Sequence, residues 1–140
     1  MVSLPLSTPS ATGRTMKYTF KIPALPESIN SLYRINYAHH VIYLSQEGRA
    51  FKQIAKSYMP PMKFPNGAKF RVVMTFCRNW HYKNKKNRRA DIQNLIKILI
   101  DAIFEHIGVD DSYVYQLAAI KKHDPKLNGN KHTVVTLESL

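Results

Sequence analysis

The sequence predicts an α+β domain in which two helices pack on one face of a small mixed β-sheet. Short segments with an apolar residue at every second position predict strands, and two longer segments with apolar residues at helical spacing predict helices. Apolar residues make up 44% of the 140 residues, which is typical of a globular protein with a real core. The predicted order is strand, hairpin, helix, strand, helix, strand, strand.

The chain is expected to form a flexible tail over residues 1–15 and one domain over 16–140. The tail is rich in Ser, Thr and Pro, has no hydrophobic period, and lacks the basic start and apolar centre of a signal peptide. No apolar run approaches the roughly 20 residues that span a bilayer, so we expect no membrane association and an intracellular protein. A single cysteine, Cys77, excludes an internal disulfide and a Cys-rich zinc site.

The N-terminal half predicts a strand, a hairpin and a helix. Residues 17–22 alternate polar and apolar side chains and are closed by prolines. After a loop over 26–34, residues 33–37 and 41–44 are expected to form a short hairpin. Ser45 is in place to cap a helix that ends at Pro60. Its apolar positions at helical spacing are Ala50, Phe51, Ile54, Ala55, Tyr58 and Met59.

The C-terminal half predicts three strands and a second helix. Residues 69–78 are apolar on both faces toward their middle, which favours a central strand. Residues 113–120 form the next strand, which Lys121 and Lys122 extend. A turn rich in Pro, Asn and Gly over 124–130 leads to a last strand over 132–137, expected to run antiparallel to the one before it.

The charge of the chain indicates a polyanionic partner. Lys+Arg is 21 and Asp+Glu is 9, a net charge of +12, which favours nucleic acid over a basic surface that only confers solubility. Residues 79–89 hold no acidic side chain and carry Lys83, Lys85, Lys86, Arg88 and Arg89. Trp80, His81 and Tyr82 precede these cations, so we expect a ring that stacks on a base or wedges a DNA junction. The alternative is a solvated loop.

The second helix is expected over residues 91–106, with Asp91 at the N-cap position and Gly108 just past its end. On a helical wheel, one face gathers the apolar side chains of Ile92, Leu95, Ile96, Leu99 and Ile103. The other face carries Asp91, Asn94, Lys97, Asp101 and Glu105. Ile98 and Phe104 interrupt this polar face, and we assign them to a contact with another subunit.

Asp91, Asp110 and Asp111 are candidate ligands of a divalent metal. Two or three carboxylates suffice for Mg²⁺, which activates water and neutralises charge on a phosphodiester. Lys97 can stabilise the transition state. Along a straight helix, however, Asp91 is more than roughly 20 Å from the other two. Either the chain after Gly108 carries the carboxylates back, or a partner subunit supplies one end, or the aspartates only cap the helix and form a turn.

A longer pattern resembles the signature of the RusA family of Holliday-junction resolvases. It reads Asp91-Ile92-Gln93-Asn94-Leu95-x-Lys97-x-x-x-Asp101-Ala102-Ile103, then Gly108-Val109-Asp110-Asp111-Ser112. The earlier loop is similar to that of the family at Pro26, Ser28, Asn30, Tyr33 and Arg34, and so is the helix start Ser45-x-Glu47-Gly48-Arg49. The resemblance covers residues 17–137.

The resemblance implies a small homodimeric endonuclease, often phage- or prophage-borne, in the cytoplasm of a bacterial host. Such an enzyme resolves four-way DNA junctions by paired nicking in recombination and repair, with Mg²⁺ or Mn²⁺. Carried over by position, Asp91, Asp110 and Asp111 form one acidic metal site per subunit and Lys97 is the catalytic lysine. Arg88 and Arg89 belong to the junction-binding surface, to which we add Arg34, Lys83, Lys85, Lys86, Lys121 and Lys122.

Gln93 departs from the family pattern, because an aspartate usually stands at this position. The glutamine offers the metal a neutral carbonyl oxygen, so we expect weaker metal binding. Asp101 lies about 15 Å further along the helix and does not substitute for it. One alternative function is therefore a branched-DNA-binding protein with weak or lost nuclease activity. Another is a basic RNA-binding or interaction module in which the aspartates are only caps, although the Arg88–Asp111 signature argues against it.

Overall fold

The computed structural model describes residues 16–25, 33–36, 38–39, 41–44, 46–81, 84, 92–127 and 129–140. Its elements are β1 (Lys17–Ile22), β2 (Tyr33–Asn36), β3 (Val41–Leu44), α1 (Gln46–Ser57), β4 (Phe70–Arg78), α2 (Ile92–Ile107), a 3₁₀ turn η2 (Asp111–Tyr113), β5 (Val114–His123) and β6 (His132–Ser139). The predicted order of strands and helices is therefore confirmed.

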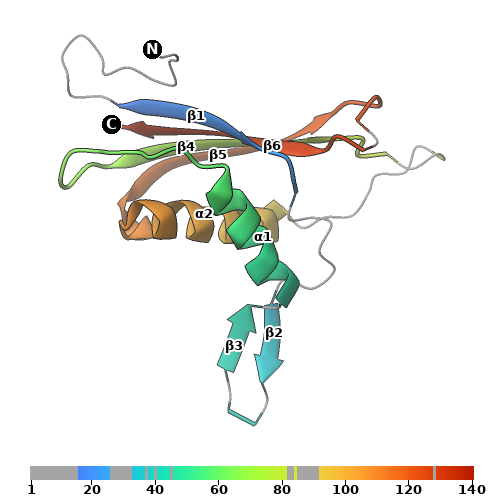
Figure 1. Ribbon diagram of the computed structural model, residues 1–140, viewed down its shortest axis with the longest axis horizontal. Coiled ribbons are helices and arrows are strands. Elements are labelled where there is room, and N and C mark those ends of the chain that lie inside the picture. The colour runs from blue at the N-terminus through green and yellow to red at the C-terminus, as the bar shows by residue number, and fades with distance from the viewer. Residues whose placement is uncertain are drawn as a thin grey trace.

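The strands β1, β6, β4 and β5 form a four-stranded sheet in that order, and β2 pairs with β3 as a separate hairpin. Both helices lie on the same side of the sheet, and the hairpin projects beyond the far end of α1 (Figure 1). The sheet is mixed, because β4 pairs parallel with β5 and antiparallel with β6. The predicted α+β class is confirmed. Among the described residues, no helix has the length and apolarity of a membrane span.

The last strand pairs differently from a simple hairpin. β6 runs opposite to β5, as expected, but it hydrogen-bonds to β1 and β4 instead of to β5. Because β4 and β5 are parallel, the chain must cross over between them, and α2 lies in that crossover. β5 is consequently an edge strand, and α2 runs back across the sheet between the end of β4 and the start of β5.

The core lies between the sheet and the two helices. β4 points Phe70, Val72, Met74 and Phe76 at the helices, and all four are buried. α1 buries Phe51 and Ala55, and Met59 just after its end is also buried. Ile54 of α1 and Tyr58 just after it, which continue the same helical spacing in the sequence, are exposed. α2 buries Leu95, Leu99 and Ile103, as the helical wheel predicts.

The expectation for Ile98 and Phe104 is wrong. Their exposed fractions are 0% and 3%, and they are buried within this chain without another subunit. The Phe104 ring packs edge-on against Phe70, with the ring centroids 5.3 Å apart. α2 has two neighbours, the sheet on one side and α1 on another. A helix packed on two sides buries a wider arc than the single face that its sequence period indicates.

An ion-pair cluster joins the two helices on their outer side. Glu105 of α2 pairs with Lys52 and with Lys56 of α1, and Lys56 Nζ lies 2.8 Å from Glu105 Oε1. These bonds lower the pKa of Glu105, with the hydrogen bond from Lys52 as the largest cause. The cluster links α1 to α2 near the end of α2 that leads to Asp110.

Candidate functional site

Gly108 ends α2 and sets the direction of the acidic pair. Its φ is +70°, a left-handed conformation that favours glycine, and the amides of Gly108 and Val109 both donate to the carbonyl of Phe104. The predicted glycine just past the helix end is thus confirmed. The chain then turns directly into η2 and β5, so Asp110 and Asp111 stay at this end of α2 and are not carried back along it.

Asp110 caps the 3₁₀ turn. Its carboxylate accepts a hydrogen bond of 2.8 Å from the amide of Ser112, in an extended backbone conformation. This hydrogen bond lowers the pKa of Asp110 and so favours the ionised carboxylate further. The turn that the sequence left open for Asp110 and Asp111 is therefore present, and Asp110 caps it. It does not exclude metal binding, because a carboxylate has about four acceptor sites and this cap uses one of them.

Asp101 interacts electrostatically with acidic residues at the same end of α2. Burial raises the pKa of Asp101, and the carboxylates of Glu105 and Asp111 raise it further, while Lys52 and Lys97 oppose the shift. Sequence reasoning set Asp101 aside because of its distance from Asp91. The signal available in the sequence was the place of Asp101 about two turns after Gln93 on the same helix, toward Asp111. Within the described ranges, no group of three or more His, Cys, Asp or Glu side chains is arranged to hold a metal ion.

Gln93 and Lys97 lie toward the opposite end of α2. Both are exposed, in the first and second turns of the helix. The helix rise puts Gln93 roughly 20 Å from Ile107, whereas a Mg²⁺ ion sits about 2.1 Å from its ligand oxygens. One chain therefore does not bring Gln93 and the Asp110–Asp111 pair to the same ion. Asp91 and the side chain of Asn94 lie outside the described residues.

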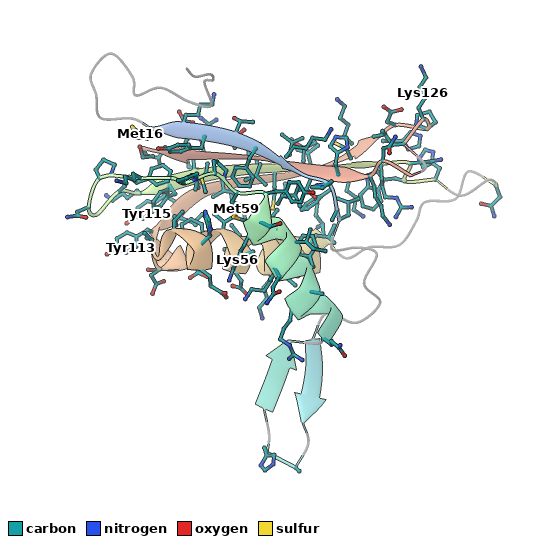
Figure 2. All side chains as sticks on the ribbon, in the orientation of Figure 1. Met16, Lys56, Met59, Tyr113, Tyr115 and Lys126 are labelled. Atoms are coloured by element: carbon teal, nitrogen blue, oxygen red, sulfur yellow. The ribbon has the colours of Figure 1, made fainter. Side chains whose placement is uncertain are left out.

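The predicted DNA-binding lysines of β5 lie at the end of the sheet away from the acidic pair. Lys121 and Lys122 are exposed and pair in register with Phe76 and Cys77 of β4. Figure 2 shows this polarity along the sheet, since Tyr113 and Tyr115 lie at one end and Lys126, just after β5, lies at the other. The predicted cations Lys83, Lys85, Lys86, Arg88 and Arg89 lie outside the described residues, as does the side chain of Arg34.

The burial of Trp80 contradicts the expectation that its ring stacks on a base. Its exposed fraction is 5%, and its indole N–H donates to the carbonyl of Phe76 at 3.0 Å. The backbone amide of Trp80 donates to Nδ1 of His123, and the ring of His123 stacks on His81 with centroids 3.9 Å apart. The indole fills the end of the core, and Lys121 Nζ lies 4.6 Å from its ring centroid. Trp80 is thus a core residue that lies directly beneath Lys121. Tyr82 lies outside the described residues.

Comparison with known protein families identifies a match over most of the chain. A family model described as "Endodeoxyribonuclease RusA" matches residues 27–138, a span that includes the Asp91–Ile103 signature and the Asp110–Asp111 pair. A search of curated proteins finds no match. The family match covers most of the chain and agrees with the observed mixed sheet and two helices. The chain therefore belongs to the RusA family of Holliday-junction-resolving endodeoxyribonucleases.

Proposed function

We propose that this chain is a metal-dependent endonuclease that resolves four-way DNA junctions by paired nicking, in DNA recombination and repair. The observation that carries the proposal is the exposed Asp110–Asp111 pair, held at the end of α2 in a chain of net charge +12. Carboxylates at a surface that must attract DNA are unfavourable unless a cation bridges them to phosphate.

The donor set fits Mg²⁺ or Mn²⁺, because both prefer hard oxygen ligands. Such an ion, when bound, neutralises charge on the phosphodiester and lowers the pKa of water. The contribution of the chain is to present the ligands: the Ser112 amide orients Asp110 and favours its ionised form. Asp91 and Gln93 are the remaining proposed ligands. Lys97, one turn after Gln93, would stabilise the charge that develops in the transition state.

We further propose that each site is shared between two copies of the chain. If two α2 helices lie antiparallel across a two-fold axis, Asp91 and Gln93 of one copy approach Asp110 and Asp111 of its partner. The edge strand β5 supports such pairing, because it exposes Tyr115, Leu117 and Ile120 with exposed fractions of 62%, 46% and 48%. Two equivalent sites would then serve the two strands that a resolvase must cut together.

The predicted cations would bind the phosphates of the junction. Lys121 and Lys122 are exposed at the end of β5, and Arg34, Lys83, Lys85, Lys86, Arg88 and Arg89 are assigned to the same surface by their charge and position in the sequence. Phosphate contacts of this kind make affinity fall steeply with salt.

The test is incubation of the purified chain with a synthetic four-way junction and Mg²⁺ or Mn²⁺. We expect symmetric nicks that Asp91→Asn, Asp110→Asn and Asp111→Asn each abolish. Asp124→Asn is a matched control, since Asp124 accepts from the amide two residues on, at 3.0 Å, as Asp110 does, but lies after β5. Absence of nicks, or nicks that persist in Asp91→Asn, would contradict the proposal.

The second candidate is a branched-DNA-binding protein with weak or lost nuclease activity. Gln93 favours it, because an amide oxygen carries no net charge to hold the metal. Tight junction binding without nicks in the wild-type chain would support this candidate.

A further inference from the structure

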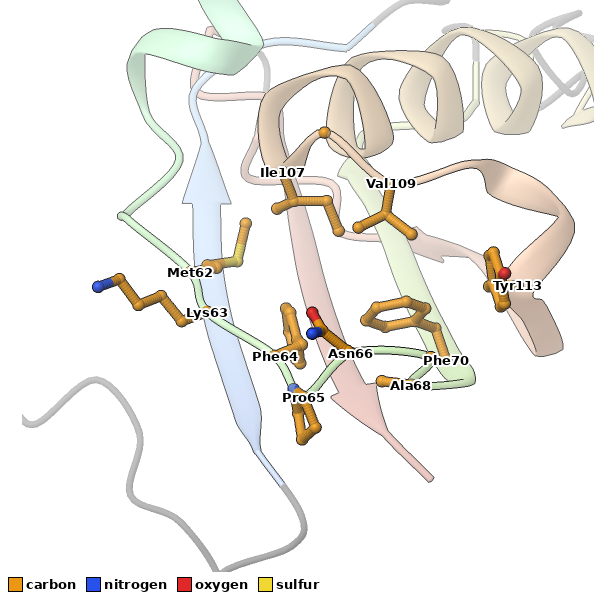
Figure 3. A pocket seen from close by; sticks show the side chains of 12 residues that line it. Met62, Lys63, Phe64, Pro65, Asn66, Ala68, Phe70, Ile107, Val109 and Tyr113 are labelled. Carbon is orange, nitrogen blue, oxygen red and sulfur yellow. The ribbon is translucent and has the colours of Figure 1, made fainter.

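A cavity of about 470 Å³ opens beside the acidic pair, between the end of α2 and the 62–68 segment (Figure 3). Val109 and Tyr113 line it, and these two residues flank Asp110 and Asp111 in the chain. The cavity therefore lies beside the segment that carries Asp110 and Asp111, although their own side chains do not line it. Its volume lies within the range of roughly 300–1,000 Å³ that is usual for small-molecule sites.

Aromatic and aliphatic side chains form the walls. In Figure 3, the rings of Phe64 and Phe70 lie across from Ile107 and Val109. Phe64 is fixed between two neighbours, because its ring packs edge-on against Phe70 at 4.8 Å and against Tyr18 at 5.3 Å. The ring of Phe64 is thus held in place, and it gives one wall of the cavity an apolar surface of the kind on which a flat ring can pack.

Polar groups lie at defined places in the same cavity. Asn66 is exposed in the turn that borders the cavity and is one of its lining residues (Figure 3), and its side-chain amide offers both a donor and an acceptor. Lys63 lines the cavity, and Lys69 follows the lining residue Ala68; both lysines are exposed. A flat apolar body with a donor–acceptor edge and an attached anion describes a nucleotide.

We propose that this cavity receives one unstacked nucleobase of the DNA strand whose phosphate lies at Asp110 and Asp111. Asn66 reads the edge of that base, and Lys63 or Lys69 contacts a neighbouring phosphate. The proposal rests on the proposed function and deepens it, since the cavity then sets the sequence preference of cleavage. Bases at the branch point of a junction have lost a stacking neighbour, so extruding one of them costs less than from an intact duplex.

Two substitutions at Asn66 test the cavity without touching the core, because Asn66 is exposed in a turn. Asn66→Ala removes the amide, and Asn66→Trp fills the space. Asn130→Ala and Asn130→Trp are the controls, since Asn130 is also exposed beside a glycine in a loop and lines a different cavity. All four chains are compared with wild type by thermal unfolding to confirm that they fold.

The first measurement is binding in EDTA, which does not require cleavage. Junctions carry 2-aminopurine at successive positions around the branch point, and the fluorescence of this base rises when it is unstacked. We expect a rise at one position per strand with wild type and with both Asn130 variants, and none with Asn66→Trp. A rise that persists in Asn66→Trp, or no responding position in the wild-type complex, would overturn the proposal.

The second measurement is discrimination among the four bases at the responding position, as the ratio of dissociation constants in EDTA. A bidentate base contact is worth roughly a tenfold preference or more, and Asn66→Ala should remove most of it. Unchanged ratios would rule out Asn66 as the reader. If Asn66→Trp instead changes the oligomeric state in sedimentation, the cavity belongs to a protein contact and the proposal is wrong.

These outcomes separate this proposal from the proposed function. A wild-type chain that extrudes the base but makes no nicks with Mg²⁺ or Mn²⁺ would contradict only the proposed nuclease activity. A chain that nicks junctions without extruding a base would contradict only the proposal for the cavity. A chain that does not bind branched DNA would contradict both.

Discussion

Gln93 and Asp111 lie at opposite ends of α2, one in its first turn and the other in the 3₁₀ turn beyond its last. The helix between them has 16 residues and is about 24 Å long. This separation motivates the proposal that a metal ion with both residues as ligands is bound between two chains.

Mixing two inactive variants tests this sharing. Asp91→Asn and Asp111→Asn should each be inactive alone, but heterodimers formed by joint refolding should nick one strand of the junction. In a shared arrangement one of the two sites of the heterodimer has both aspartates intact, whereas the other has lost both. The measurement is nicking of a junction labelled separately on each strand.

The control for mixing is the double variant Asp91→Asn/Asp111→Asn refolded with wild type. In a shared arrangement every site of that heterodimer has lost one aspartate, so only residual wild-type homodimers cut. The opposite pattern, with nicks from the double-variant mixture and none from the two single variants, would show that each site belongs to one chain.

Gln93→Asp should strengthen metal binding. The substitution adds a carboxylate to the proposed ligand set, and we expect the Mg²⁺ concentration for half-maximal nicking to fall on the order of tenfold. Gln53→Asp, at an exposed position of α1, adds the same charge elsewhere and should leave the metal requirement unchanged. An unchanged requirement in Gln93→Asp would remove residue 93 from the ligand set.

Trp80→Ala should lower the free energy of unfolding without removing a DNA contact. The buried indole predicts a loss of about 3–5 kcal/mol in the free energy of unfolding. Trp80→Phe keeps most of the buried area but loses the hydrogen bond to Phe76, and should cost about 1 kcal/mol or somewhat more. Denaturant unfolding gives both values. Junction affinity of folded Trp80→Phe should equal that of wild type, and a large loss would restore a stacking role.

Lys121→Ala and Lys122→Ala should weaken junction binding in a way that depends on salt. Each lysine that contacts a phosphate contributes about one unit to the slope of log K against log salt, so each substitution should reduce that slope by about 1. Lys126→Ala is the control, because Lys126 is exposed in the turn after β5. Equal slopes for all three variants and wild type would place the DNA elsewhere.

Glu105→Gln should lower stability at neutral pH by roughly 0.2–1 kcal/mol, the range for solvent-screened pairs, since the Glu105 side chain is 49% exposed. The pKa of Glu105 is lowered in the folded protein, so its contribution is complete above its ordinary value of 4.5 and is lost as pH falls through the depressed pKa. Unfolding curves of wild type and variant should therefore converge in acid. A difference that persists there would point to packing instead of charge.

Local patterns in the sequence were sufficient to predict the helices and strands themselves. Alternation along β4 and helical spacing along α2 reflect which faces are buried, and Gly108 marks a backbone turn that few other residues adopt. These are properties of neighbouring residues, and they hold wherever the element packs. The family signature over Asp91–Asp111 is of the same kind, because it is a pattern of residue types at fixed spacing.

The pairing of distant elements was decided only by the tertiary structure. β6 lies between β1 and β4, Ile98 and Phe104 of α2 are buried in the core of this chain, and Trp80 closes the core beneath Lys121. No local period encodes such contacts, since they depend on which surfaces meet after the chain has crossed over. For the same reason, the spacing between Gln93 and Asp111 gave their separation along the helix but not the direction of the chain after Gly108. The fold keeps the acidic pair at the far end of α2, beside the cavity of Asn66.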